Sequence, residues 1–314
     1  MTDHIKILVD AINHSMMRYQ SLGDYSATQL IDAPRIVALR KRYGEYTDPT
    51  IEQQIASFIG TGIHEYFRRS LQNVSAKHTD YMLERSVSVP FFFSDDTNDH
   101  RMISGTFDIL HKEEDIYDIK TVNVWKTVFD PDMKDWHEQQ NIYAWLLRNR
   151  GLNIKSVNII AIYKDWIKSN AIRNAKYPQS QVTHYKLKLW NQSETEQFIH
   201  KRLVQHVACE TCKDDNLPEC SPEERWERET TKYAILKNDR AKRAMKVCDS
   251  LSEATTAVHA LKVTSDSFVE VRPAKRTRCE AWCPVNRFCN VWNDYQNRLD
   301  NSDNWIIPVS KLGR

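Results

Sequence analysis

The segment GTFDILHKEEDIYDIKT, residues 105–121, carries the features that decide the fold. Residues 101–110 and 115–122 are rich in β-branched and aromatic side chains, which favour strands, and the polar stretch HKEED between them suits a hairpin turn. Two such strands can be neighbours in a sheet, so we expect Asp108 and Asp118 to meet at one end of it. Asp118 and Lys120, two positions apart, share a face of their strand.

This group of side chains suits phosphodiester chemistry. Two carboxylates are hard oxygen ligands of the kind that Mg²⁺ or Mn²⁺ prefers, and the carbonyl oxygen of Ile119 could add a third. Lys120 would point into the same pocket, where it could orient the attacking water or help to deprotonate it. Taken alone the pattern is weak, because an isolated aspartate or a D-x-K triplet occurs by chance in many strands.

The remaining elements predict an α/β protein with a mixed sheet. A Thr28 cap opens the first expected helix, and Ser193 with Glu196 forms a capping box at the last. Gly60 and Gly62 interrupt the second helix at a cost of about 1 kcal/mol each, which suggests close approach by another backbone or a ligand. The expected helices span 28–42, 50–72, 132–150 and 193–208, and further strands span 81–93, 154–163 and 182–190.

Two further motifs flank the acidic pair. GTGIHEYF contains Gly60 and His64, and QQNIYAWLL contains Gln139 and Tyr143, which lie at i, i+4 on one helical face. For His64 a satisfied histidine on an amphipathic helix is an alternative, and for Tyr143 core packing is an alternative that can also hold together with a functional role.

With these motifs in order, the chain resembles the RecB-type nucleases of the PD-(D/E)XK superfamily, through GTFD, DIKT, G-x-x-x-H and Q-x-x-x-Y. The resemblance implies a restriction-endonuclease-like fold, in which helices flank a mixed central sheet, and a Mg²⁺- or Mn²⁺-dependent deoxyribonuclease. It implies that His64 binds metal together with Asp108, Asp118 and the Ile119 carbonyl. Lys120 would then be catalytic and Gln139 and Tyr143 would position the site. Glu84, in the preceding strand, could add a carboxylate.

The cysteines indicate a second centre. Cys279, Cys283 and Cys289 form a C-x3-C-x5-C pattern, and Cys220 is the best candidate for a fourth ligand. RecB-like nucleases with an iron–sulfur cluster, including the CRISPR-adaptation nucleases and the AddB subunit, combine one distant cysteine with a C-terminal trio. This similarity implies a structural [4Fe-4S] cluster, although the lone cysteine of those families precedes the nuclease motifs and here it follows them.

Other ligand sets stay open. Cys209 and Cys212, spaced as C-x2-C, could form a structural Zn²⁺ site with Cys220 and either Cys248 or a histidine. Unligated thiols are also possible, and Cys248 in particular suits a buried apolar position. The seven cysteines are an odd number, and together with the absence of a signal peptide this argues against a disulfide framework.

Composition shifts divide the chain into three regions. Residues 1–80 form an N-terminal helical region that includes the G-x-x-x-H helix, and residues 81–208 form the nuclease core. Residues 209–314 form a cysteine-containing C-terminal region with a small α+β insertion at about 231–272.

The bulk properties limit location and partners. No stretch approaches the roughly 20 apolar residues that span a bilayer, and the N-terminus lacks a signal-peptide core, so we expect a cytoplasmic protein with no membrane contact. The net charge of +2 restricts a nucleic-acid surface to local patches. Candidate patches, where cations lie beside aromatic rings, are 40–43, 66–69 and Trp125-Lys126, and they suit DNA that is single-stranded or has free ends.

The family resemblance implies an exonuclease or end-processing enzyme of phage or mobile-element recombination and repair, located in the host cytoplasm if it is phage-encoded. The chain has no P-loop, so unwinding would need a helicase or recombinase partner. The alternatives are a DNA-binding accessory protein on a nuclease scaffold that no longer cuts, and a thiolate-metal interaction protein whose acidic pair is incidental.

Overall fold

The structure is a computed structural model, and it describes residues 12, 22–47, 51–75, 80–93, 99–112, 114–227, 230–238, 240–241, 243–261, 263–264, 266–300 and 305–312. The chain divides into two compact units, one of residues 1–32 and 49–208 and the other of residues 33–48 and 209–314. The three regions expected from the sequence stay a prediction, because a compact unit need not be a domain that folds alone.

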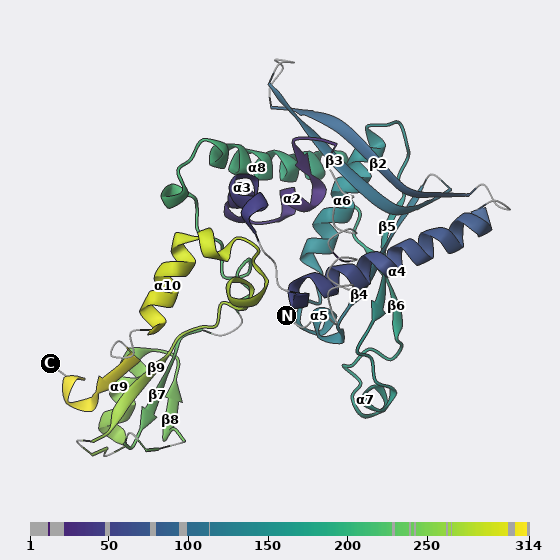
Figure 1. The fold of residues 1–314 in the computed structure, drawn as a ribbon. Helices are drawn as coiled ribbons and strands as arrows, with labels where there is room; N and C mark the ends of the chain where they lie inside the picture. Colours follow the sequence, from purple (N-terminus) through teal and green to yellow (C-terminus); the bar gives the residue numbers. More distant parts are fainter. Residues whose placement is uncertain are drawn as a thin grey trace, which may run out of the picture. The chain divides into compact units, whose positions relative to one another are not determined.

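A mixed sheet forms the centre of the first unit (Figure 1). Its strand order is β1-β3-β4-β5-β6, and β2 also pairs with β3. The β4–β5 and β1–β3 pairs are parallel, whereas β2–β3, β3–β4 and β5–β6 are antiparallel. The strands are β1 (Tyr25–Ser26), β2 (Tyr81–Phe92), β3 (His100–His111), β4 (Asp115–Val122), β5 (Ser156–Tyr163) and β6 (Val182–Leu187).

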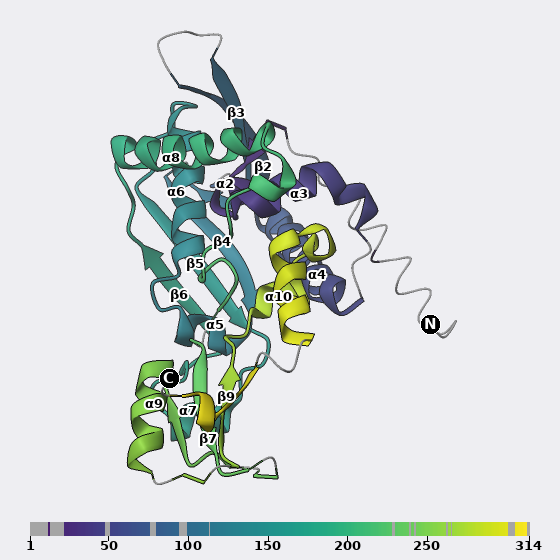
Figure 2. The same cartoon turned by 90° about the vertical axis from the view of Figure 1, so that its left-hand side faces the viewer.

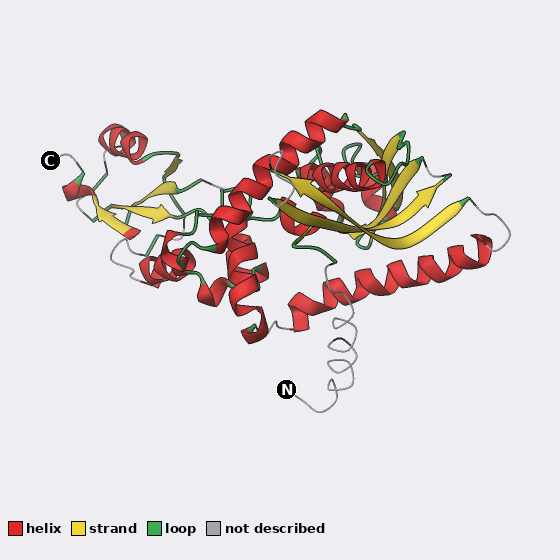
Figure 3. Cartoon of the chain, turned by 90° about the horizontal axis from the view of Figure 1, so that it is seen from above, coloured by secondary structure: helices red, strands yellow, loops and turns green. Residues whose placement is uncertain are grey.

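Helices cover both sides of this sheet. The long helix α4 (Ile51–Ser75) contacts β2 and β4, and α6 (Lys134–Arg148) contacts β2, β3, β4 and β5. Figure 3 shows α4 running along one side of the strands while other helices lie on the opposite side. The remaining helices of this unit are α2 (Ala27–Ile31), α5 (Val124–Phe129), α7 (Lys168–Arg173) and α8 (Gln192–Glu210), whose last two residues belong to the second unit. The predicted class, a mixed α/β sheet flanked by helices, is confirmed.

The first expected helix is broken in two. It ends at Ile31 and resumes as α3 (Pro34–Tyr43), because Pro34 has no N–H to donate and disfavours helical geometry at Ala33, whose ψ is 129°. The cap expected at Thr28 lies at Ser26 instead. Its hydroxyl accepts the Gln29 N–H at 3.2 Å, and the Gln29 side chain accepts the Ser26 N–H at 2.8 Å.

The N-terminal box of α8 is also shifted by two residues. Asn191 Oδ1 accepts the Glu194 N–H, and Glu194 Oε2 accepts the Asn191 N–H, both at 2.8 Å. The box expected at Ser193 and Glu196 is therefore wrong. Asparagine caps a helix as well as serine does, so residue types alone did not separate the two registers.

The glycines behave differently from one another. A Cβ placed on Gly60 or Gly62 in α4 would meet no atom within 4 Å, so the expected close approach of another backbone is wrong among the described residues. Gly105 in β3 is a glycine that the packing of α6 requires. A Cβ there would lie 2.6 Å from Cε1 of Tyr143 and 2.9 Å from Cδ1 of Leu146, both on α6.

The second unit contains a small sheet of its own, with strand order β10-β9-β7-β8 and antiparallel pairing throughout. Figures 1 and 2 show α9 (Leu251–Ala260) beside this sheet, where Val258 packs with Ile235 and Val269. Cys248 is 1% exposed in the same apolar cluster. The strands are β7 (Lys232–Leu236), β8 (Lys246–Cys248), β9 (Phe268–Arg272) and β10 (Ile306–Pro308), and β10 lies outside the expected insertion at about 231–272.

Short helical turns lie on either side of this small sheet in the chain. Helix α10 (Asn290–Asp300) follows the π-helix Arg278–Trp282 and the 3-10 turn Asn286–Phe288. Further 3-10 turns are Gly44–Tyr46, Asp214–Asn216 and Val309–Lys311. None of the described helices is both long and apolar enough to pass through a bilayer.

Replacing Gly105 with alanine tests the packing of α6 on β3. The added methyl group forces Tyr143 or the strand to move, so we expect Gly105→Ala to lower the free energy of unfolding by about 1–3 kcal/mol. Urea denaturation measures this change. Gly60→Ala is the matched control, because its methyl group meets open space and should raise helix stability by about 0.5–1 kcal/mol. Equal stability of Gly105→Ala and wild type would contradict the contact.

Candidate active site

The strands β3 and β4 separate at the acidic pair. Their pairing runs from His111↔Asp115 to Ile109↔Tyr117 next to the hairpin, and the following position in this register sets Asp108 opposite Asp118. There the Ile119 N–H donates to Oδ2 of Asp108 at 2.8 Å. The Asp108 carboxylate thus accepts a bond that a backbone carbonyl would accept in a regular ladder. The same carboxylate links β3 to β4 and belongs to the candidate active site.

Asp118 and Lys120 lie on one face of β4, as their spacing predicts. Lys120 Nζ is 2.9 Å from Oδ2 of Asp118, whose side chain is 4% exposed. Burial raises the pKa of the Asp118 carboxyl, although the Lys120 charge opposes this. Burial alone would lower the pKa of Lys120, but the charge of Asp118 outweighs it and the net direction is upward. Lys120 is therefore an ammonium group in this arrangement.

Helix α6 supplies the partners of Lys120. Gln139 Oε1 accepts a hydrogen bond from Lys120 Nζ at 2.9 Å, and Gln139 Nε2 donates to the Tyr143 hydroxyl at 2.9 Å. Burial, followed by the charges of Asp118 and Asp108, raises the pKa of Tyr143 well above its usual value. Because Tyr143 also packs on Gly105, its core-packing role and its place in this chain of hydrogen bonds hold together.

His64 reaches the site from the opposite helix, α4. Its Nδ1 lies 3.2 Å from Oδ2 of Asp108. Burial would lower the pKa of His64, but the hydrogen bond to Asp108 and the negative charge of that residue raise it more. The histidine on this amphipathic helix is therefore directed at the acidic pair.

Glu84 occupies a strained position beside Asp108. The β2–β3 register is unchanged from Leu83↔Ile109 to Arg85↔Phe107, which sets Glu84 opposite Asp108, and Glu84 has a φ of +42°. Burial and the charge of Asp108 raise the pKa of Glu84, although Arg68 lies 3.7 Å away. A non-glycine residue held in this region costs about 1–3 kcal/mol and is typical of functional sites.

A hollow with an empty volume of about 210 Å³ opens on the α4 side of this group. Glu84, His64, Asp108 and Ile119 all line it. Since neighbouring strand residues face opposite ways, Ile119 faces this hollow while Asp118 and Lys120 face α6. The strand separation thus opens the site to both sides of the sheet.

The donor atoms fit a hard divalent cation. Oδ2 of Asp118 is buried and accepts no hydrogen bond of good angle, even though Lys120 Nζ is close to it. However, no three His, Cys, Asp or Glu side chains among the described residues already form a metal-binding group. The reason lies in the pairing: Asp118 is bound to Lys120, and Asp108 to His64 and Ile119. A cation would take its oxygens from these partners.

The second candidate centre lies in the other unit. A cavity with an empty volume of about 330 Å³ is lined by Cys220, Cys279, Cys283 and Cys289. Burial raises the pKa of Cys220 to about 12 and that of Cys279 to about 11, and the neighbouring cysteines add to both shifts. The ionised form of these neighbouring thiols is therefore unfavourable unless a cation lies beside them. A metal ion or an iron–sulfur cluster would supply that positive charge.

A buried arginine adjoins the same cavity. Arg35 is 2% exposed, and its Nε donates to Sγ of Cys289 at 3.2 Å. Its other acceptors are the backbone oxygens of Leu217 and Asp214 and the side-chain oxygen of Asn290, none of which is charged. The charge of Arg35 interacts with the Asp214 carboxylate, and its bond to Cys289 would also suit a thiolate of a metal or cluster centre.

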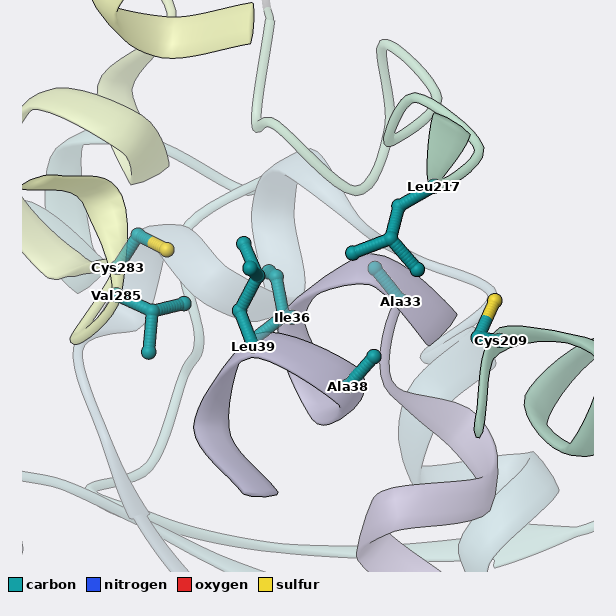
Figure 4. Close-up of a cluster of buried hydrophobic side chains, with 8 residues drawn as sticks. All are labelled: Ala33, Ile36, Ala38, Leu39, Cys209, Leu217, Cys283 and Val285. Atoms are coloured by element: carbon teal, nitrogen blue, oxygen red, sulfur yellow. The ribbon is translucent and has the colours of Figure 1, made fainter. Parts of the chain in front are cut away.

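Cys209 and Cys212 do not line this cavity. Figure 4 shows Cys209 and Cys283 on opposite sides of the apolar cluster, with Ile36 and Leu39 beside Cys283. Burial, followed by the neighbouring Cys212, raises the pKa of Cys209. The geometry therefore favours a site formed by Cys220, Cys279, Cys283 and Cys289 over one that combines Cys220 with Cys209 and Cys212.

Two of the three basic–aromatic segments have structural roles. In 40–43, Arg42 pairs with Asp214, and Tyr43 stacks on Phe288 with ring centroids 4.7 Å apart. In 66–69 both arginines bond to Glu65. The pairing of these cations weakens the interpretation of the two segments as nucleic-acid surfaces, and exposed rings remain at Tyr66 and Trp125, which are 73% and 48% exposed.

Similarity to known proteins is low. Neither a protein-family model nor a curated protein sequence matches the chain. Among solved structures, the crystal structure of SSO0001 aligns with 65% of this chain and 87% of its own, at 15% identity and a TM-score of 0.45. The alkaline exonuclease LHK-Exo from Laribacter hongkongensis aligns with 58% of this chain and 87% of its own, at 11% identity and a TM-score of 0.33. Likenesses this distant do not assign the chain to a family.

Substituting Glu84 tests the strain at the site. Glycine adopts a positive φ freely, so we expect Glu84→Gly to raise the free energy of unfolding by about 1 kcal/mol or more, measured by thermal or urea denaturation. Glu84→Gln keeps the strained backbone and removes only the charge, and it should gain less. A Glu84→Gly variant less stable than Glu84→Gln would show that the backbone at this position is not strained.

Proposed function

We propose that the chain is a divalent-metal-dependent deoxyribonuclease of the RecB-like PD-(D/E)XK kind, with a restriction-endonuclease-like sheet. The main support is that Asp108 binds the N–H of Ile119, between Asp118 and Lys120 on β4, and that the charges of Asp108 and Lys120 both act on Asp118. Hydrolysis of a phosphodiester needs ligands for a cation and a positive group beside the attacking water.

The cation would be Mg²⁺ or Mn²⁺, which supplies charge neutralisation of the scissile phosphate and acidifies water. Asp108, Asp118, His64 and the Ile119 carbonyl would hold it. Glu84 lines the same hollow and is the nearest further carboxylate. All of these ligands are hard oxygens except the imidazole of His64, which matches the preference of Mg²⁺ and Mn²⁺ over Zn²⁺.

The remaining residues act on the water and on one another. Lys120 Nζ is held between acceptors on Asp118 and Gln139, an environment that keeps it protonated. It would therefore orient the attacking water by donating a hydrogen bond. Gln139 fixes the direction of that ammonium, and the Tyr143 hydroxyl fixes Gln139. Burial of this chain of contacts strengthens each electrostatic interaction relative to water.

Loss of either key side chain should abolish cleavage. We expect Asp118→Asn and Lys120→Ala each to lower the rate of Mn²⁺-dependent degradation of end-labelled DNA by about 100-fold or more, the usual contribution of such groups. The assay uses 5′- and 3′-labelled single- and double-stranded DNA, which also reveals exonuclease action and its polarity.

The control for this assay is Lys155→Ala, which removes an exposed lysine that pairs with Glu114 at the far end of the sheet. Its activity should match that of wild type. Equal degradation by wild type, Asp118→Asn and Lys120→Ala would contradict the proposed site. Binding of DNA by the wild-type protein without any cleavage would favour the accessory-protein alternative.

We also propose that Cys220, Cys279, Cys283 and Cys289 hold a [4Fe-4S] cluster, with structural Zn²⁺ as the alternative. Support comes from their shared cavity and from the buried guanidinium of Arg35 beside Cys289. Four thiolates leave no open coordination position, so such a centre would stabilise the fold rather than take part in catalysis.

Cysteine substitutions separate the two ligand sets. Cys283→Ser should lose the bound iron, the brown colour and the broad visible absorption of anaerobically purified protein, because one thiolate is removed. Cys212→Ser should keep all three. Iron and zinc analysis is the measurement, and loss of metal from Cys212→Ser but not from Cys283→Ser would contradict the assignment.

The biological setting that we propose follows from the family resemblance. It is exonucleolytic end processing of DNA, single-stranded or with free ends, in phage or mobile-element recombination and repair, with a helicase or recombinase as partner. A cytoplasmic location would suit the cysteines, all seven of which are free thiols in the structure.

A further inference from the structure

Helix α5 presents two stacked aromatic rings to solvent. Trp125 is 48% exposed and Phe129 is 60% exposed. They lie at i, i+4 on one helix, with ring centroids 5.4 Å apart and an interplanar angle of 21°. The buried ring of Tyr177 supports Trp125 edge-on at 6.4 Å. The rings are thus pre-arranged nearly parallel while a large part of each remains accessible.

This ring pair lies close to the candidate active site within the same unit. Strand β4 carries Lys120 and ends at Val122, three residues before Trp125. At about 3.3 Å per residue, α5 begins within about 13 Å of Lys120 along the chain, because Val124 is its first residue. A second link runs through space, since Lys126 on α5 bonds to Asp135 at 3.0 Å and the charge of Asp135 reaches Lys120. Bases stack about 3.4 Å apart, so a strand cut beside Lys120 would reach the rings within a few nucleotides.

Exposed cations lie in the segment that packs against helix α5. Lys164, Lys168, Arg173 and Lys176 lie in the β5–β6 connection, which packs against α5 through Tyr177 and Ala171. None of the four pairs with a carboxylate in the part of the chain that the structure describes. Of the nearby acids, Asp130 and Asp135 are bonded to Lys126, at 2.8 Å and 3.0 Å, and Asp165 accepts the Val124 N–H at 2.7 Å. The balance of charge beside the rings therefore favours phosphate.

We propose that Trp125 and Phe129 form a stacking platform for the bases of unpaired nucleotides next to the cleavage site, with phosphates bound by the cations of residues 164–176. This deepens the proposed nuclease function by naming its substrate as single-stranded DNA, or a duplex end whose strand has separated. Aromatic faces beside phosphate-binding cations are the combination that binds single strands without sequence preference. Paired bases inside a duplex present no free face to such rings.

Binding in EDTA tests the platform without requiring catalysis. Fluorescence anisotropy would measure the affinity of the full chain for a fluorescein-labelled oligo(dT) of about 12 nucleotides and for a blunt duplex. We expect Trp125→Ala and Phe129→Ala each to weaken oligo(dT) binding by about 5- to 100-fold, the range for loss of one base–aromatic stack. Trp125→Phe retains a ring and should recover most of the affinity, whereas duplex binding should be unaffected.

Two control variants make the result specific. Tyr46→Ala removes a ring that is 65% exposed in the other unit, and Ile172→Ala removes an apolar side chain that is 77% exposed on α7. Both should bind oligo(dT) as wild type does. If Trp125→Ala and Phe129→Ala bind oligo(dT) like wild type, or lose duplex affinity equally, the platform is refuted. Tighter ring-dependent binding of oligo(U) than of oligo(dT) would overturn the assignment to DNA.

This outcome is separable from that of the nuclease proposal. Ring-dependent binding by a protein that cuts no DNA in Mn²⁺ would uphold the platform and refute the enzyme. A second outcome is cleavage that depends on Asp118 and Lys120, together with oligo(dT) affinity that is the same with and without the rings of Trp125 and Phe129. This outcome would refute the platform and leave the nuclease proposal standing.

Discussion

One hydrogen bond organises the candidate site, the bond from the Ile119 N–H to the Asp108 carboxylate. In a regular ladder this N–H would donate to a backbone carbonyl of the neighbouring strand. Here the acceptor is a side chain that also contacts His64. The arrangement satisfies a buried backbone donor and at the same time fixes a carboxylate between the strands. Everything else at the site depends on this separation, because it lets groups from α4 and α6 approach the same point from opposite sides of the sheet.

The site is built from interactions that oppose stability locally. Asp118 and Lys120 are nearly buried, which costs solvation, and Glu84 holds an unfavourable backbone conformation. The pairing of Asp118 with Lys120 offsets the burial of both charges. The Asp118 oxygen that contacts Lys120 is also one that would hold a cation, and the cation would supply the positive charge that Lys120 now places there. The tight packing of Tyr143 on Gly105 supplies the rigid support that such a site needs.

Much of the central sheet followed from the sequence because its strands carry strong local patterns. β4 coincides with the range expected for it, and Asp118 and Lys120 share a face as strand periodicity requires. Helix boundaries were less accessible. Pro34 broke a helix whose apolar spacing continues across it, and Asn191 and Ser193 are equally good caps. The sequence could not reveal the positive φ of Glu84, because a glutamate inside a strand pattern predicts ordinary extended backbone. Nor could it reveal the buried Arg35 beside Cys289, which joins residues 254 positions apart. Exposed rings on α5 belonged to a segment not recognised as a helix at all.

The central claim is that Asp108 and Asp118 bind one cation at the point where β3 and β4 separate. Anomalous scattering from crystals soaked in Mn²⁺ locates such an ion directly. We expect a peak bonded to carboxylate oxygens of both aspartates, with His64 or the Ile119 carbonyl completing the site and Lys120 Nζ turned away from Asp118. A fully occupied Mn²⁺ elsewhere in the unit, with Asp118 still paired to Lys120, would contradict the account.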